Sequence, residues 1–264
     1  MAVNWVRFPS GAADRTTAPV PLWPLETVLD AVAGAGFPSI GLDHYSLARF
    51  AGGPDELATA LAERGLGCSD IGILTVGALE LADVERLAST AAAVGARLCI
   101  AALYRPMPHE QIVRDLRAAA EVLSPAGIRT AFEFTVYGHP TSLADAVRIC
   151  DDVGWDDCGL LVDAWHVFRG GVSLDEVAAL DGGRIALVHV DDGGLEPSAD
   201  AMAEGRFHRL LPGSGSFDLM GFRDALDAAG YEGPISLEVL SEELRQLAPP
   251  DAARRLRRSM GSYF

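Results

Sequence analysis

The sequence contains no lysine, so arginine supplies all 21 of its lysine-plus-arginine positions. Without lysine the protein cannot form a Schiff base with a carbonyl substrate, and electrophilic assistance must come from another group. The four cysteines show no CxxC spacing, which argues against both a disulfide framework and a thiolate zinc site. No apolar stretch approaches the roughly 20 residues of a membrane span, and no secretory signal pattern opens the chain. We therefore expect a cytoplasmic protein that makes no membrane contact.

Basic charge is also scarce, since the formal net charge is -16 at pH 7. Such a balance repels phosphate backbones and anionic lipid surfaces, so we expect a small-molecule substrate and no nucleic-acid partner. The arginine-rich stretch from Ala252 to Arg258 is the exception. We interpret it as a solvated last helix or as a subunit contact, which leaves a homo-oligomer open.

Hydrophobic residues make up 49% of the chain and charged residues 22%, a profile typical of globular proteins. Short apolar runs alternate with stretches of helical periodicity, which indicates βα units and a parallel sheet. The strand candidates are Trp5 to Pro9, Ser39 to Asp43, Gly67 to Leu74, Arg97 to Ala102, Arg129 to Phe134, Cys158 to Asp163, Ile185 to Val190 and Ile235 to Val239. The helix candidates include Leu25 to Val32, Asp55 to Arg64, Asp83 to Val94, Glu110 to Leu123 and Phe222 to Ala229. Eight such units in 264 residues predict an α/β fold with one domain over residues 1–264, a (β/α)8 TIM barrel.

Local signals support these boundaries. Pro54 stands where the first turn of a helix tolerates proline, and Ser173 with Glu176 forms a capping-box pattern. The last two strands are separated by a longer connection than the others, which predicts an inserted loop at about residues 193–211. Long loops at the carboxyl face of a barrel are usually functional, so we expect a lid or a wall of the substrate site.

Four consecutive strands end in side chains that a buried strand does not normally carry: Glu133, Asp163, His189 and Glu238. Any one of them alone could be a salt-bridge partner, a helix cap or a hydrogen-bonded core histidine. Together they occupy equivalent positions at the face where barrels hold their active sites. Because isolated buried charges are costly unless they are paired or metal-bound, the four predict one divalent metal site.

Three carboxylates and one imidazole form a hard, oxygen-rich donor set. We expect Mn²⁺, with Mg²⁺, Co²⁺ and Zn²⁺ as alternatives. Such an ion acts as a Lewis acid on a carbonyl and an adjacent hydroxyl. Glu133 and Glu238 lie at opposite sides of the arc, where each can exchange a proton with one face of the substrate carbon.

The earlier strand ends carry further candidates for the pocket. Arg7, Asp43, His44, Tyr45 and Tyr104 could line it, and aromatic walls are common in small-molecule sites. Of these, His44 and Tyr104 are taken as substrate-binding candidates, although solvent-exposed loop positions explain all five equally well.

The sequence resembles the xylose isomerase-like barrels called sugar phosphate isomerases/epimerases, which include ketose 3-epimerases, inosose isomerases and dehydratases, and 3-dehydroshikimate dehydratases. The motifs that carry the resemblance are Val162-Asp163-Ala164-Trp165-His166, Val188-His189-Val190-Asp191-Asp192, Arg209-Leu210-Leu211-Pro212-Gly213-Ser214-Gly215 and Ile235-Ser236-Leu237-Glu238-Val239. The resemblance implies that the four strand-end residues bind the metal and that Glu133 and Glu238 transfer the proton. It further implies that His166 contacts substrate oxygens and that Arg209 contacts substrate or orients Glu238.

The resulting hypothesis is an isomerase or epimerase of a small polyhydroxylated ketone, of sugar or cyclitol type, acting through a metal-bound enediolate. The alternative is a dehydratase of an inosose-like or 3-dehydroshikimate-like substrate. An endonuclease-type barrel is disfavoured by the acidic charge and by only six histidines, and a non-catalytic barrel by the intact set of four ligands. The absence of lysine and of a glycine-rich phosphate cradle favours an unphosphorylated substrate.

Overall fold

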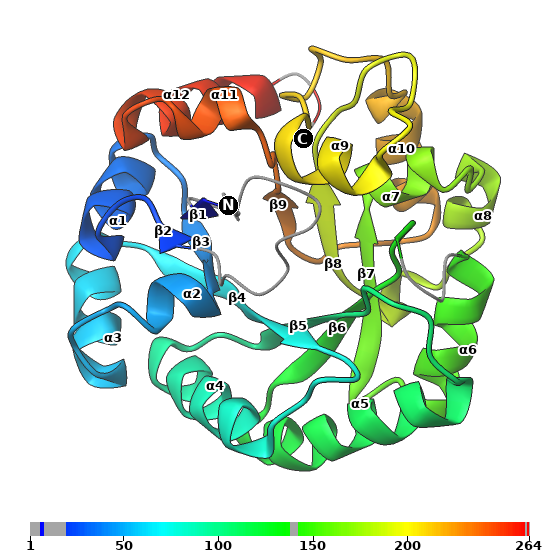
Figure 1. The fold of residues 1–264 in the computed structure, drawn as a ribbon, viewed down its shortest axis with the longest axis horizontal. Coiled ribbons are helices and arrows are strands. Elements are labelled where there is room, and N and C mark those ends of the chain that lie inside the picture. The colour runs from blue at the N-terminus through cyan, green and yellow to red at the C-terminus, as the bar shows by residue number, and fades with distance from the viewer. Residues whose placement is uncertain (1–5, 8–19, 138–141, 262, 264) are drawn as a thin grey trace.

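The computed structural model describes residues 6–7, 20–137, 142–261 and 263. Seven parallel strands form one curved sheet, in the order β3-β4-β5-β6-β7-β8-β9, that nearly closes into a barrel surrounded by helices (Figure 1). The strands are β3 Ser39–Asp43, β4 Gly67–Thr75, β5 Leu98–Ala102, β6 Arg129–Glu133, β7 Cys158–Asp163, β8 Ile185–Val190 and β9 Ile235–Leu237. The fold class predicted from the alternating pattern, a TIM barrel, is confirmed.

The helices lie outside this sheet and cover it (Figure 1). They are α1 Leu25–Gly34, α2 His44–Leu47, α3 Pro54–Glu63, α4 Leu81–Val94, α5 His109–Leu123, α6 Leu143–Val153, α7 Ala164–Arg169, α8 Leu174–Ala178, α9 Ala201–Phe207, α10 Leu219–Ala228, α11 Glu242–Arg245 and α12 Pro249–Met260. On α5 the buried residues Ile112, Leu116, Ala119 and Leu123 recur at helical spacing and form the face that meets the sheet. The capping box between Ser173 and Glu176 is present at the start of α8.

The sheet register brings the strand ends to one edge. Every residue of β7 and β8 is buried, as expected for parallel strands covered by helices. Asp163 at the end of β7 is paired with His189 of β8, and Glu133 ends β6 beside β7. Glu238 follows β9, and its backbone N–H donates to the carbonyl of Val190 at 3.2 Å. The backbone therefore fixes the positions of all four predicted ligands.

The prediction of a first barrel strand from Trp5 to Pro9 is wrong for the part that the structure describes. Val6–Arg7 forms β1, which pairs antiparallel with β2, Val20–Pro21, in a separate two-stranded sheet. Antiparallel partners need only a direct loop between them, whereas a parallel partner needs a crossover. The other residues of the predicted strand, Trp5, Phe8 and Pro9, lie outside the described residues.

The insertion predicted at residues 193–211 contains α9, whose Glu204 pairs with Arg169 at the end of α7. The bridge between Asp192 and Leu210 joins the two ends of the insertion to each other, and the bridge between His208 and Ser241 joins it to the segment after β9. Within the part of the chain that the structure describes, no helix has the length and apolar character needed to cross a bilayer.

Candidate active site

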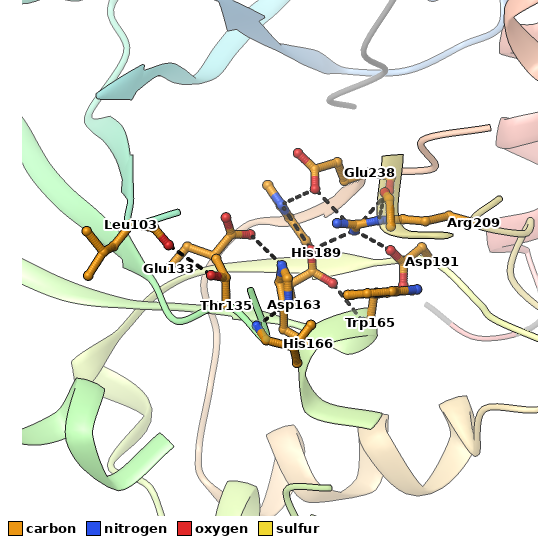
Figure 2. Close-up of polar contacts among 12 residues, drawn as sticks. Leu103, Glu133, Thr135, Asp163, Trp165, His166, His189, Asp191, Arg209 and Glu238 are labelled. Atoms are coloured by element: carbon orange, nitrogen blue, oxygen red, sulfur yellow. Dashed lines mark hydrogen bonds and ion pairs between the residues drawn. The ribbon is translucent and has the colours of Figure 1, made fainter. Parts of the chain in front are cut away.

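The structure brings Glu133, Asp163, His189 and Glu238 together at the barrel mouth, and we call them the strand-end quartet (Figure 2). Each of the four offers one ligand atom, and these atoms all lie within 4.8 Å of one another. The first three are buried, whereas the side chain of Glu238 remains 21% exposed. The quartet therefore has the spacing of a single-ion site that opens toward solvent on the Glu238 side.

His189 provides an independent test of whether a metal fits here. Both of its ring nitrogens are buried, and neither has a hydrogen-bond partner among the described residues. Its Nδ1 lies 3.5 Å from Glu238 Oε2 and 4.0 Å from Asp163 Oδ2, which are the distances of groups that surround a common point. Buried polar atoms without a partner are rare in proteins, so this imidazole fits the role of a metal ligand.

Crowding of acidic groups perturbs the titration of the quartet. Burial, followed by repulsion from Glu238 and Asp163, raises the pKa of Glu133 to about 8. Burial lowers the pKa of His189, but attraction to Glu238 and the other carboxylates outweighs it and raises the value to about 9. In both groups the shift favours the protonated form, because each added proton brings positive charge among closely spaced carboxylates. A divalent cation would supply that charge.

The guanidinium of Arg209 contacts the carboxylates of Asp163 and Glu238 on the side of the quartet away from Glu133 (Figure 2). Its Nη1 donates to Asp163 Oδ2 at 2.8 Å and to Asp191 Oδ2, and lies 3.2 Å from Glu238 Oε2. Its Nε donates to the carbonyl of Gly205 at 2.9 Å. Although burial opposes it, the guanidinium helps to hold the pKa of Asp163 below its usual value. Arg209 therefore orients two members of the quartet through one nitrogen.

His166 lies beside Glu133 in the cavity lining, with its Nε2 4.0 Å from Glu133 Oε1. Its Nδ1 accepts a hydrogen bond from the backbone N–H of Val136 at 3.3 Å, so the ring proton is on Nε2. Burial lowers the pKa of His166 to about 3. His166 is thus a neutral imidazole that can donate its Nε2–H to a substrate oxygen.

A cavity of about 240 Å³ opens over the quartet. The predicted residues that line it are Asp43, Tyr45, Tyr104, Glu133, His166, Arg209 and Glu238. His44 is not part of this lining: its Nδ1 accepts from the backbone N–H of Ile73 at 3.1 Å, and it lines a second cavity bordered by α3 and α4. The side chain of Arg7 lies outside the described residues.

Sequence reasoning missed Asp191, Tyr137 and Arg206 as residues of the site. Asp191 is fully buried against Arg209, and the other two line the cavity. The sequence did contain a signal for Asp191, because this acidic residue stands two positions after His189 in the same buried stretch. Tyr137 and Arg206 lie in connections, where no strand periodicity indicates the direction of a side chain.

Residues 29–263 match the pattern of the family described as "Xylose isomerase-like TIM barrel". The chain belongs to this family. A 3-dehydroshikimate dehydratase of Pseudomonas aeruginosa is 28% identical over 236 residues, which cover 82% of this chain and 36% of the relative. An inosose isomerase of Halalkalibacterium halodurans is 30% identical over 146 residues, or 54% of this chain and 50% of the relative. These matches thus span between about a third and half of the length of the curated relatives.

A solved structure described as IOLI protein with a binding zinc atom superposes with a TM-score of 0.83 over 92% of this chain and 95% of that chain. At 20% identity this likeness shows a shared fold. The curated relatives carry enzyme names, of an isomerase and of a dehydratase. These names belong to the relatives and refer to two different reactions, isomerisation and dehydration.

Proposed function

We propose that the protein is a divalent-metal-dependent isomerase or epimerase of a small, unphosphorylated polyhydroxylated ketone. The observation that carries the proposal is that Glu133 and Glu238 belong to the quartet and also line the cavity. A substrate in the cavity therefore meets two carboxylates that come from different strands, and each can exchange a proton with it.

Glu133, Asp163, His189 and Glu238 would hold the ion, with Mn²⁺ as the first metal to test. The zinc atom in a solved structure of the same fold makes Zn²⁺ the second. When bound, the ion supplies a Lewis acid that polarises a carbonyl oxygen and the neighbouring hydroxyl. The buried ring nitrogens of His189, which make no hydrogen bond within the described residues, support this assignment.

The chain's own residues then perform the proton transfers. One glutamate removes the proton from the carbon between the carbonyl and the hydroxyl, and the other returns a proton to the opposite face or to the neighbouring carbon. His166 donates its Nε2–H to a substrate oxygen, and Arg209 keeps Glu238 in place.

Dehydration is the second candidate. The Pseudomonas aeruginosa dehydratase match spans 82% of this chain, whereas the inosose isomerase match spans 54%. Removal of the proton from the carbon next to the carbonyl leaves an enolate. This enolate expels water if a hydroxyl two carbons from the carbonyl is aligned to leave. The product mass separates the two reactions, since only the dehydratase releases a molecule of water.

The proposal predicts that Glu133→Gln and Glu238→Gln each lower solvent-deuterium incorporation into recovered ketone by about 100-fold or more, the range for loss of a general acid or base. The assay is mass spectrometry of ketoses, inososes and 3-dehydroshikimate incubated with the Mn²⁺-loaded protein in D2O. Glu85→Gln, on the exposed face of α4, is the matched control. Exchange at the wild-type rate in both cavity variants would refute the mechanism. Failure of the wild-type protein to bind a stoichiometric divalent ion would refute the metal site.

A further inference from the structure

Asp191 is a carboxylate that neither the quartet nor the proposed proton transfers use. It follows β8 directly, is fully buried and is absent from the described lining of the cavity. Its Oδ2 accepts a hydrogen bond from Arg209 Nη1, whereas its Oδ1 makes no hydrogen bond within the described residues. A buried carboxylate with so few partners adds little to stability. Any effect of Asp191 on the reaction therefore passes through Arg209.

The backbone holds Asp191 and Arg209 against each other. Asp192 and Leu210 form an antiparallel bridge, in which each backbone N–H donates to the carbonyl of the other residue, at 3.0 Å and 2.8 Å. The residues just before these two are diagonal neighbours across the bridge, so their side chains lie on the same face. The buried indole of Trp165 packs over the guanidinium, with Arg209 Cζ 5.3 Å from the ring centroid. Arg209 thus has little freedom to turn away from Asp191.

The acids around Arg209 Nη1 share its hydrogens unequally (Figure 2). An Nη atom of arginine carries only two hydrogens. Within the described residues they are donated to Asp163 Oδ2 at 2.8 Å, to Asp191 Oδ2 and, at 3.4 Å, to the backbone carbonyl of Glu238. The carboxylate of Glu238 forms an ion pair with the same nitrogen at 3.2 Å but no hydrogen bond. Arg209 therefore attracts this carboxylate without binding it directly.

This division of hydrogens matters for Glu238. If no acceptor stood at position 191, Nη1 would have a hydrogen to donate to Glu238 Oε2, which is already within 3.2 Å. Oε2 also lies 3.5 Å from His189 Nδ1, on the side where the quartet would hold its ion. A charge-assisted hydrogen bond at this oxygen would be strong and would compete with metal binding and with proton transfer.

We propose that Asp191 is a positioning residue whose acceptor oxygen withholds an Arg209 N–H from Glu238, so that Arg209 places this glutamate by charge and leaves its oxygens available. The inference rests on the proposed function for the proton that Glu238 transfers. It assigns the effect to the acceptor oxygen at position 191. Asp191→Asn, which keeps an acceptor, and Asp191→Leu, which has none, should therefore behave differently.

The kinetic test measures deuterium exchange from D2O into the same ketones at varied concentration, with every protein loaded with Mn²⁺. Asp191→Leu should lower kcat by about 10-fold to 100-fold, the effect of one added hydrogen bond to a charged group. KM should change by less than about twofold, because the residue does not line the cavity. Asp191→Asn should retain at least about a third of the wild-type kcat. Asp224→Leu, on the exposed face of α10, is the control and should exchange as the wild type does.

A second readout does not depend on turnover. In a crystal structure of Asp191→Leu, Arg209 Nη1 should donate to Glu238 Oε2 at about 2.8 Å. In Asp191→Asn the distance should stay near the 3.2 Å of the wild type. Unfolding midpoints and metal content establish that each variant is folded. Asp191→Ala removes the acceptor with less bulk, and it gives the same two measurements if Asp191→Leu does not fold.

Two results would overturn the assignment. Equal losses of kcat in Asp191→Asn and Asp191→Leu would assign the effect to charge or packing. An unchanged distance between Arg209 and Glu238 in the variants without an acceptor would show that no N–H is being withheld. A loss that appears in KM alone would also contradict a positioning role. If the metal-loaded wild type exchanges none of the ketones, the proposed function fails, while the crystal structures still decide the role of Asp191.

Discussion

At the scale of single residues, the main feature of the site is that one guanidinium serves three carboxylates. Arg209 Nη1 contacts Asp163, Asp191 and Glu238, and the arginine itself is only 2% exposed. Burial lowers the pKa of Arg209, but these acids outweigh it and raise the value. A buried ion pair often gives little net stability, yet removing one partner leaves uncompensated charge. The arginine is therefore as important for folding as for orienting Glu238.

Arg209→Met should destabilise the metal-free protein by about 3 to 5 kcal/mol, because it leaves buried carboxylates without a counter-charge. Arg209→Lys should recover part of this loss, since an ammonium keeps the charge but lacks the planar fork that reaches Gly205 and the acids together. Urea unfolding monitored by circular dichroism measures both. A free energy of unfolding within about 0.5 kcal/mol of wild type in Arg209→Met would contradict the importance of the cluster, because only remote surface changes are that small.

At the scale of elements, the segment that follows β8 is organised by one carboxylate. Asp192 Oδ1 accepts from the backbone N–H groups of Gly193 at 2.8 Å and Phe217 at 3.0 Å. Its Oδ2 accepts from Gly213 and Gly215, both at 2.9 Å. Four backbone donors thus converge on one buried side chain, which closes the base of the insertion and fixes where residues 209–218 leave the barrel.

This convergence leaves no room for a side chain at Gly215. A Cβ atom there would lie 2.2 Å from Asp192 Oδ1 and 2.3 Å from the carbonyl of Gly193. Gly215→Ala should therefore cost about 1 to 3 kcal/mol of stability, the usual range for overpacking. Gly194→Ala, in the same insertion but with nothing within 4 Å of its added Cβ, is the control. Equal unfolding midpoints for the two variants would show that the Asp192 turn is not rigid.

Most elements were predictable because hydrophobic periodicity determines them locally. The predicted bounds of β3, β7 and β8 coincide with the structure, and those of β4, β5 and β6 differ by one residue at one end. The grouping of the four predicted ligands was also predictable, because the strand ends of a parallel barrel meet at one face. The first strand was predicted wrongly, since an apolar run of a few residues does not specify whether its partner is the barrel or a neighbouring segment.

Other parts of the site could not be predicted from periodicity. Arg206 and Tyr137 lie in connections, and their positions depend on tertiary contacts such as the fit of Gly205 against the Tyr137 hydroxyl. His44 shows the converse: it follows β3 directly, but the backbone N–H of Ile73 binds its Nδ1 and the side chain lines a different cavity. Position at a strand end places a backbone, whereas neighbouring contacts decide where a side chain lies.

At the scale of the whole molecule, charge couples metal binding to pH. The net charge is -16, and the barrel places the three carboxylates of the quartet, two of them buried, close together at its mouth. Without metal, the protein compensates by retaining protons, with the pKa of Glu133 at about 8 through burial and the pKa of His189 at about 9 through its acidic neighbours against the effect of burial. The pKa of Asp163 is lowered despite burial, through Arg209, so this ligand is already ionised.

Metal ligands must be deprotonated, so Mn²⁺ binding has to displace these protons. At pH 7, below both raised pKa values, binding should release between about one and two protons, and affinity should rise about 10-fold or more per pH unit from pH 6 to 7. The rise should flatten as pH passes about 8 to 9, where Glu133 and His189 lose their protons without metal. Calorimetric titrations in buffers of different ionisation enthalpy count the protons. Glu133→Gln, which has no carboxyl proton to lose, should release fewer, whereas zero release by the wild type at pH 7 would mean that the metal-free quartet is already ionised.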